Sequence, residues 1–196
     1  MTPRQPYPGT DRKLVLGFDI GTTYAGISYS FLQPGLPPTI LPVTRFPPQE
    51  HVGSDSKVRS LVYYDSGGRP MACGAMAVQE QVEEKAEEQN WHKAEWFKLH
   101  MRPDHIVSTS IDILPPLPEN THGSDVYADF LHYLYGCAQS YLIDTYHEGE
   151  ALWVELQHTA ECAKQQLLQD SSQTTLLDMI GFILSLKEKQ VCIFAS

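Results

Sequence analysis

The stretch Leu14–Gly26 carries the residues with the clearest potential for chemistry. It reads LVLGFDIGTTYAG, so an apolar run is interrupted by Asp19 and then by Gly21, Thr22 and Thr23. A carboxylate among apolar residues is costly unless a charged group lies beside it. Consecutive backbone amides in a tight turn form a concavity that binds anions, and Asp19 would hold a hydrated Mg²⁺ beside it.

This turn is open to two interpretations. Gly21 permits a positive φ and a close backbone approach, which suits a phosphate-binding hairpin. The general phosphate loop, G-x-x-x-x-G-K-[ST], is not matched, because no lysine precedes the hydroxyls and the residues that follow predict a strand. An ordinary hairpin in which Asp19 accepts backbone hydrogen bonds fits the same residues, and spacing alone leaves both interpretations open.

Two hairpins and three helices must position these residues. The run from Leu14 to Phe18 predicts a buried strand, and the alternation in ISYSF predicts its partner. The segments SLVYYD, SGG and RPMACG predict a second hairpin whose glycines form the turn. We expect a mainly antiparallel sheet over residues 14–74, packed by helices near 76–100, 124–145 and 150–169.

The second of these helices has the clearest pattern. Its apolar residues recur at near-helical spacing, at Val126, Phe130, Leu134, Ala138 and Tyr141. Ser124 is a candidate cap. We interpret the neighbouring His122, Ser124 and Asp125 as helix-start chemistry and not as a catalytic triad, because triads are assembled in space.

Composition limits the function classes. Fourteen basic residues against twenty-four acidic ones give a formal charge of −10, which argues against nucleic-acid or anionic-membrane partners. The four cysteines have no C-x-x-C spacing, and the histidines form no H-E-x-x-H, so neither a disulfide scaffold nor a structural metal site is expected. The chain starts without an apolar signal core, and no apolar run reaches the length of a membrane span. We expect a cytoplasmic protein.

The segment VLGFDIGTTY resembles the first phosphate motif of the heat shock protein 70 family, in the superfamily that includes actin and the sugar kinases. GISYSF is most similar to the divergent twelve-type branch of that family. RSLVYYDSGGRPMACGAMA, AEWFKLHM and GSDVYADFLHYLYGCAQSYL are similar to later segments of the same lobe, so the resemblance covers about Leu14 to Tyr146. Phe18 and Ala25 depart from the usual motif. The implied fold class is α/β, a partial actin-like ATPase (ribonuclease-H-like) lobe with mainly antiparallel hairpins packed by helices.

The resemblance also implies roles for individual residues. Gly21, Thr22, Thr23 and Tyr24 would touch the β- and γ-phosphates of ATP. Asp19 would position Mg²⁺ through water. Lys98 would neutralise charge at the γ-phosphate and orient the attacking water. The nearby Lys93 is the alternative for this role, and without the resemblance both lysines would be assigned to a solvated helix face.

Two parts of the family's ATP site are not found. The second phosphate motif, D-x-G-G-G-T, and the adenosine-binding glycine pair are missing, and the DSGG at 65–68 fits a hairpin turn better. We therefore expect a flexible segment at 1–12, an N-terminal lobe at 13–150 and a divergent or truncated segment at 151–196. Half a phosphate clamp predicts weak binding of Mg²⁺–ATP and little or no hydrolysis by the chain alone.

Three functions are compatible with these observations. The first is a fragment of a heat shock protein 70-like ATP-binding domain, with nucleotide and protein partners. The second is a non-catalytic interaction module that retains the fold. The third is a fragment of a sugar-kinase-like phosphotransferase, but the YSF continuation and the WFKLHM segment favour the chaperone lineage.

Overall fold

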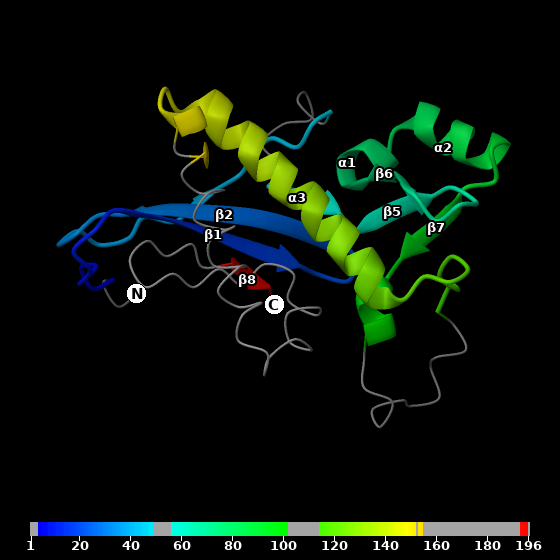
Figure 1. Cartoon of the computed structure of the whole chain (residues 1–196), viewed down its shortest axis with the longest axis horizontal. Coiled ribbons are helices and arrows are strands. Elements are labelled where there is room, and N and C mark those ends of the chain that lie inside the picture. The colour runs from blue at the N-terminus through cyan, green and yellow to red at the C-terminus, as the bar shows by residue number, and fades with distance from the viewer. Residues whose placement is uncertain (1–3, 49–55, 102–113, 152, 155–192, 196) are drawn as a thin grey trace. The chain divides into compact units, whose positions relative to one another are not determined.

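The computed structural model describes residues 4–48, 56–101, 114–151, 153–154 and 193–195. The chain divides into two compact units, each built from separated segments. One unit contains Met1–Asp19, Ile27–Val43 and Ala138–Ser196, and the other contains Ile20–Gly26 and Thr44–Cys137. Within the described residues the fold is mixed α/β, with two sheets and few helices (Figure 1). This confirms the α/β class, while the predicted domain boundaries stay predictions.

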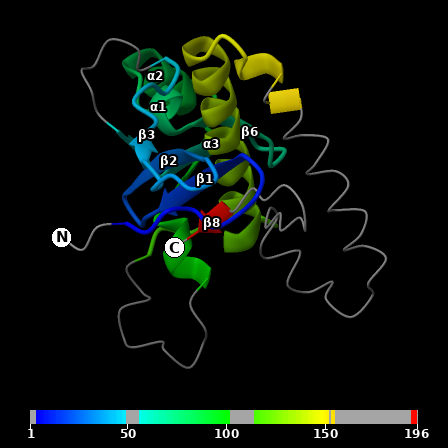
Figure 2. The ribbon, with the colours of Figure 1, turned by 90° about the vertical axis from the view of Figure 1, so that its left-hand side faces the viewer.

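The first sheet is built on the expected N-terminal hairpin. Four of its five strands follow the order β3-β2-β1-β8, namely β1 (Lys13–Ile20), β2 (Tyr24–Leu32), β3 (Leu41–Pro42) and β8 (Ile193–Ala195), and the fifth, β4 (Lys57–Arg59), pairs with β2. The proline-containing segment after β2 is loop apart from the two residues of β3. β8 runs parallel to β1, beside it in Figure 2, so the sheet is not wholly antiparallel.

Strand β1 is buried on one face only. Leu16, Phe18 and Ile20 are at most 1% exposed, whereas Asp19 between them is exposed. The strand expected at Leu14–Phe18 is confirmed, but only alternate residues of β1 are fully buried, which is the pattern of a half-buried strand. An exposed carboxylate has a much smaller desolvation cost than a buried one.

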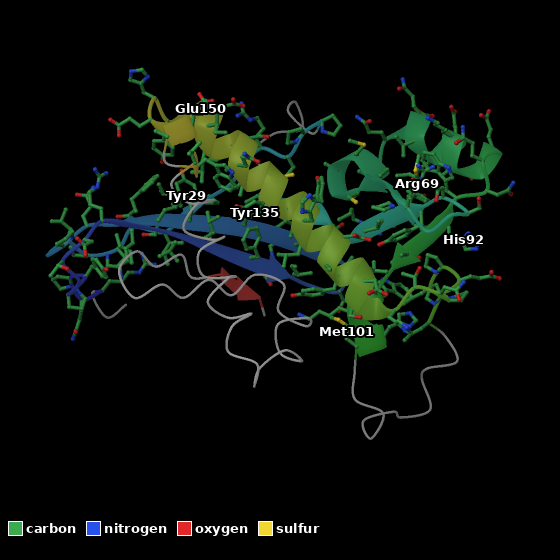
Figure 3. The ribbon with its side chains drawn as sticks, viewed as in Figure 1. Tyr29, Arg69, His92, Met101, Tyr135 and Glu150 are labelled. Carbon is green, nitrogen blue, oxygen red and sulfur yellow. The ribbon has the colours of Figure 1, made fainter. Side chains whose placement is uncertain are left out.

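An aromatic cluster packs β2 against the end of α3 (Gly123–Thr145). The Tyr29 ring lies 5.9 Å from Tyr141, and the Phe31 ring lies 5.1 Å from Tyr146, measured between centroids. The Tyr29 and Tyr146 hydroxyls share a hydrogen bond of 2.8 Å, so the polar tips inside the cluster satisfy one another. Figure 3 labels Tyr29, whose ring lies under the helix.

The second sheet has the order β6-β5-β7. It joins β5 (Leu61–Tyr64), β6 (Pro70–Cys73) and β7 (His92–Glu95), and the short β4 (Lys57–Arg59) pairs with β2 instead. The predicted hairpin over SLVYYD and RPMACG is confirmed as β5 and β6. Its turn is held by Asp65, whose Oδ1 accepts hydrogen bonds of 2.9 Å from the Gly67 and Arg69 amides. The DSGG segment is thus the hairpin turn that the sequence indicates.

The helix expected near 76–100 is confirmed only in its first half, and the second half is a strand and a 3₁₀ helix. The structure has α1 (Gly74–Ala77) and α2 (Glu80–Glu88), then β7, then the 3₁₀ helix η1 (Phe97–Met101). Asn90 ends α2 in the left-handed conformation, with φ 52°. Its amide donates to Glu87 O, and the Trp91 amide donates to Ala86 O at 2.8 Å, which is the Schellman pattern of helix termination.

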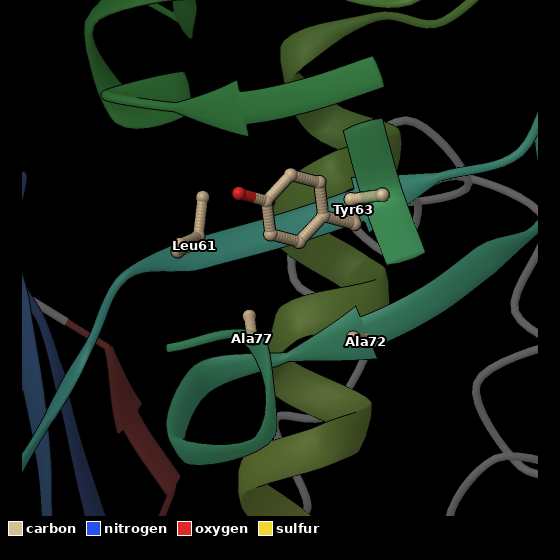
Figure 4. Close-up of a cluster of buried hydrophobic side chains, with 5 residues drawn as sticks. Leu61, Tyr63, Ala72 and Ala77 are labelled. Carbon is tan, nitrogen blue, oxygen red and sulfur yellow. The ribbon is translucent and has the colours of Figure 1, made fainter. Parts of the chain in front are cut away.

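The helices α1 and α2 cover one face of this sheet. Their contacts with the strands form a buried cluster of Leu61, Tyr63, Ala72, Ala77 and Ala86 (Figure 4). Val82 and Trp91 pack against its edge. The small residues of the helices allow close approach to the sheet, so the larger apolar surface comes from the strand residues.

Helix α3 confirms the predicted helix at 124–145 and most of its apolar face. Val126, Phe130, Leu134 and Ala138 are fully buried. The Phe130 ring lies 5.5 Å from Phe97 of η1. Tyr64 OH donates a 2.7 Å hydrogen bond to Asp129 Oδ2, and burial, followed by this carboxylate, raises the Tyr64 pKa. The first half of α3 is thereby attached to both η1 and β5.

The start of α3 corrects the predicted cap. His122 is the cap residue, because its carbonyl accepts from Val126 N and its amide donates to Asp125 Oδ2 at 2.8 Å. Ser124 lies inside the first turn and is exposed. The group is helix-start chemistry, as the sequence indicates. Of the third predicted helix, only residues 149–151 and 153–154 are described as helical, and most of 150–169 lies outside the described residues.

Candidate functional site

The predicted phosphate turn is a tight hairpin between β1 and β2. The Gly21 amide donates to Tyr24 O at 3.1 Å, which leaves Thr22 and Thr23 as the turn itself. Gly21 is not among the glycines with positive φ, so the turn does not use the backbone freedom that glycine permits. The close approach is confirmed, because a Cβ at Gly21 would lie 2.5 Å from Tyr24 O. Glycine is required here by space and not by backbone conformation.

Ser60 holds the turn from the end of β4. Its hydroxyl donates to Gly21 O at 2.9 Å, and its backbone amide donates to Thr23 O, also at 2.9 Å. Ser60 itself is only 3% exposed. Two carbonyls of the turn are therefore bonded to one buried residue, which limits the conformations open to Thr22 and Thr23.

Lys98 reaches the same turn from η1. Its Nζ donates to Ile20 O at 2.8 Å, across 78 positions of sequence. The chain enters η1 through Trp96, which has a left-handed φ of 54°, and Phe97 is buried beside Lys98. The structure thus brings together the turn and the lysine that the family resemblance singles out.

Lys93, the alternative lysine, lies elsewhere. It is on β7, where it pairs with Tyr63 of β5, and its Nζ is 3.4 Å from Glu95 Oε2. Its side chain is 44% exposed, whereas Lys98 is half-buried. The solvated-face interpretation therefore fits Lys93, although on a strand, and does not fit Lys98.

The open side of the turn carries an aromatic ring and a guanidinium. Tyr24 is 49% exposed, and the Arg59 guanidinium carbon lies 5.3 Å from its ring centroid. Thr23 is also exposed. Arg59 and Ser60 were not singled out by the sequence analysis, and no local pattern marks them, because they act on a turn that lies more than thirty positions earlier.

These groups have the chemistry of an anion site. Threonine hydroxyls, an ammonium and a guanidinium are hydrogen-bond donors, and two of them carry positive charge. Asp19 lies two residues before Gly21 on the exposed face of β1, and a carboxylate is the type of ligand that a hydrated Mg²⁺ takes. Such a cation is commonly held by one or two carboxylates together with substrate phosphates. In the described part of the chain, no group of three or more His, Cys, Asp or Glu side chains could hold a metal by itself.

Comparisons with known proteins give no relative. No family model, no curated protein and no solved structure matches this chain. Among the described helices, none combines the length and the apolar character needed to cross a bilayer.

Proposed function

We propose that the hairpin at Gly21–Tyr24 binds the phosphates of Mg²⁺–ATP. The chain would be part of a heat shock protein 70-like, actin-like ATPase domain, in the cytoplasm, and weak or inactive in hydrolysis alone. The observation that carries the proposal is the bond between Lys98 Nζ and Ile20 O. It holds the ammonium of Lys98 at the residue that precedes the turn, which is where the proposed role of this lysine requires it.

Each residue has a stated role in this proposal. The hydroxyls and amides of Thr22 and Thr23 meet the β- and γ-phosphates, with Gly21 and Tyr24 forming the ends of the turn. The Lys98 ammonium, held at Ile20 O, brings a positive charge to the turn, and such a charge would attract a phosphate oxygen. Asp19 orders the water shell of Mg²⁺, and its exposure suits a contact made through water.

Exposure at the turn argues for weak affinity. Thr23 and Tyr24 face solvent, where charged contacts are screened and each contributes little. Binding would be tight only if a second surface closed over the phosphates. We therefore expect an affinity well below that of a complete two-lobed ATPase.

Calorimetry with Mg²⁺–ATP tests the proposal. Lys98→Met should weaken binding, while Lys93→Met, which removes the same charge from a surface ion pair, should leave it unchanged. Asp19→Asn should weaken binding only when Mg²⁺ is present. Equal affinities for the two lysine variants, or no binding by the wild-type chain, would reject the phosphate site and favour a non-catalytic interaction module.

A further inference from the structure

Arg59 is placed on the turn by strand pairing. In the antiparallel β2–β4 ladder it lies directly opposite Tyr24, so the two side chains share one face of the sheet. Its neighbours Val58 and Ser60 are 2% and 3% exposed, so they point inward and Arg59 points outward. The guanidinium carbon lies 5.3 Å from the Tyr24 ring centroid, within the range of a cation–π contact.

The backbone of Arg59 cannot move far from the turn. Ser60, the next residue, donates both its hydroxyl and its amide to the turn carbonyls of Gly21 and Thr23. The Tyr24 ring further restricts the side chain. The guanidinium is therefore held beside the turn before any ligand arrives, which reduces the entropy lost when it binds one.

The charge of Arg59 is not used by the rest of the described chain. Among the residues that the structure describes, the Arg59 guanidinium contacts the Tyr24 ring and forms no ion pair with a carboxylate. By contrast, Arg69 is paired with Asp65 at 2.9 Å.

We infer that Arg59 is a second cationic ligand of the phosphate chain, opposite Lys98. The inference rests on the proposed function and adds a binding residue to it. A cation–π contact uses none of the guanidinium N–H groups as hydrogen-bond donors to oxygen, and the spacing of these groups matches two oxygens of a phosphate. Lys98 approaches the turn through a carbonyl of β1, and Arg59 approaches through the strand paired with β2. One cation is thus attached at the β1 end of the turn, and the other lies beside its β2 end.

Calorimetry at fixed ionic strength tests Arg59 with two probes, Mg²⁺–ATP and inorganic tripolyphosphate. Arg59→Gln should weaken binding of both by about tenfold, because it removes a charge-assisted pair of hydrogen bonds in an exposed site. Arg59→Lys should lose part of this affinity, since it keeps the charge without the planar fork. The matched control is Lys85→Gln, which removes a cation stacked on Trp91 at 5.5 Å, away from the turn.

Each outcome decides between the two claims. If the wild type binds neither probe, the proposed function fails and the inference fails with it. If the wild type binds and Lys98→Met weakens binding, but Arg59→Gln matches Lys85→Gln, only the inference is overturned. If Arg59→Gln weakens binding of ATP but not of tripolyphosphate, Arg59 contacts the nucleoside and not the phosphates, and the inference is also overturned. Urea unfolding establishes that each variant is folded. If Arg59→Gln is not folded, the comparison is made with Arg59→Lys.

Discussion

Replacing Gly74 by alanine should disrupt the packing of α1 against α3. Gly74 has a left-handed φ of 55°, and a Cβ there would collide with the Tyr133 ring, with Cζ and the hydroxyl oxygen at 2.7 Å. The same hydroxyl accepts a 3.1 Å hydrogen bond from the Ala75 amide. Alanine must therefore adopt an unfavourable backbone conformation and also displace the tyrosine.

The expected loss follows from these two effects. Placing a Cβ in the left-handed region costs about 1–2 kcal/mol. Moving Tyr133 away leaves the Ala75 amide, in a buried residue, without its acceptor, which costs about 1–3 kcal/mol. We expect Gly74→Ala to lower the free energy of unfolding by about 3 kcal/mol, a large part of the ~5–15 kcal/mol of a typical domain.

Two other glycines separate the effects in urea unfolding. Gly68 has a φ of 76° with nothing within 4 Å of a new Cβ, so Gly68→Ala should show the backbone cost alone, about 1–2 kcal/mol. Gly136, inside α3, also has open space, and Gly136→Ala should stabilise the chain by about 0.5–1 kcal/mol. A loss for Gly74→Ala no larger than that for Gly68→Ala would refute the predicted collision with Tyr133.

Three further predictions concern turnover, pH and the start of α3. Steady-state phosphate release under excess Mg²⁺–ATP should stay at background, and Lys98→Ala should not change it. Turnover by the wild type that is abolished in Lys98→Ala would contradict this prediction and mean that the chain forms a complete ATPase site. Burial raises the pKa of the Cys73 thiol to about 12 and that of Cys137 to about 11, from 9.0. The thiols of the unfolded chain ionise at a lower pH than those of the folded chain, so the free energy of unfolding should be fully retained below pH 9 and should fall as the pH rises toward 11–12. The fall should be shallower in Cys137→Ala. Equal slopes for this variant and the wild type would contradict the assignment of the fall to the buried thiols. Asp125→Ala should cost about 1 kcal/mol by removing the acceptor of the His122 amide, and Ser124→Ala much less, as thermal unfolding would show.

Local patterns predicted the elements that are determined by nearby residues. The alternation in ISYSF gave β2, the glycines after SLVYYD gave the β5–β6 turn, and the spacing from Val126 to Ala138 gave the buried face of α3. Each depends on contacts within a few residues or on a simple inside–outside pattern. Such signals survive in the sequence because no distant partner is needed to define them.

Other features depend on distant partners and were missed. The segment His92–Glu95 becomes a strand because β5 pairs with it from Leu61 to Tyr64, and the polar residues HKAE give little sign of that. The end of α2 at Asn90 is different, because asparagine is a common residue after a helix and could have been recognised. Asp19 was taken as buried because the run around it is apolar, although alternate residues of a strand face opposite ways.

The bonds that hold the Gly21–Tyr24 turn also set the order in which it can form. A hairpin closes in about 1–10 μs from local contacts, but Ser60 and Lys98 lie 39 and 78 positions from the carbonyls they bond. Long-range contacts of this kind form late in folding, because the intervening chain must first be ordered. We therefore expect the turn to form early as a bare loop and to gain the bonds from Ser60 and Lys98 only when β4 and η1 dock. Phosphate binding at this turn would accordingly report completed folding, and a chain arrested before η1 is in place would lack it.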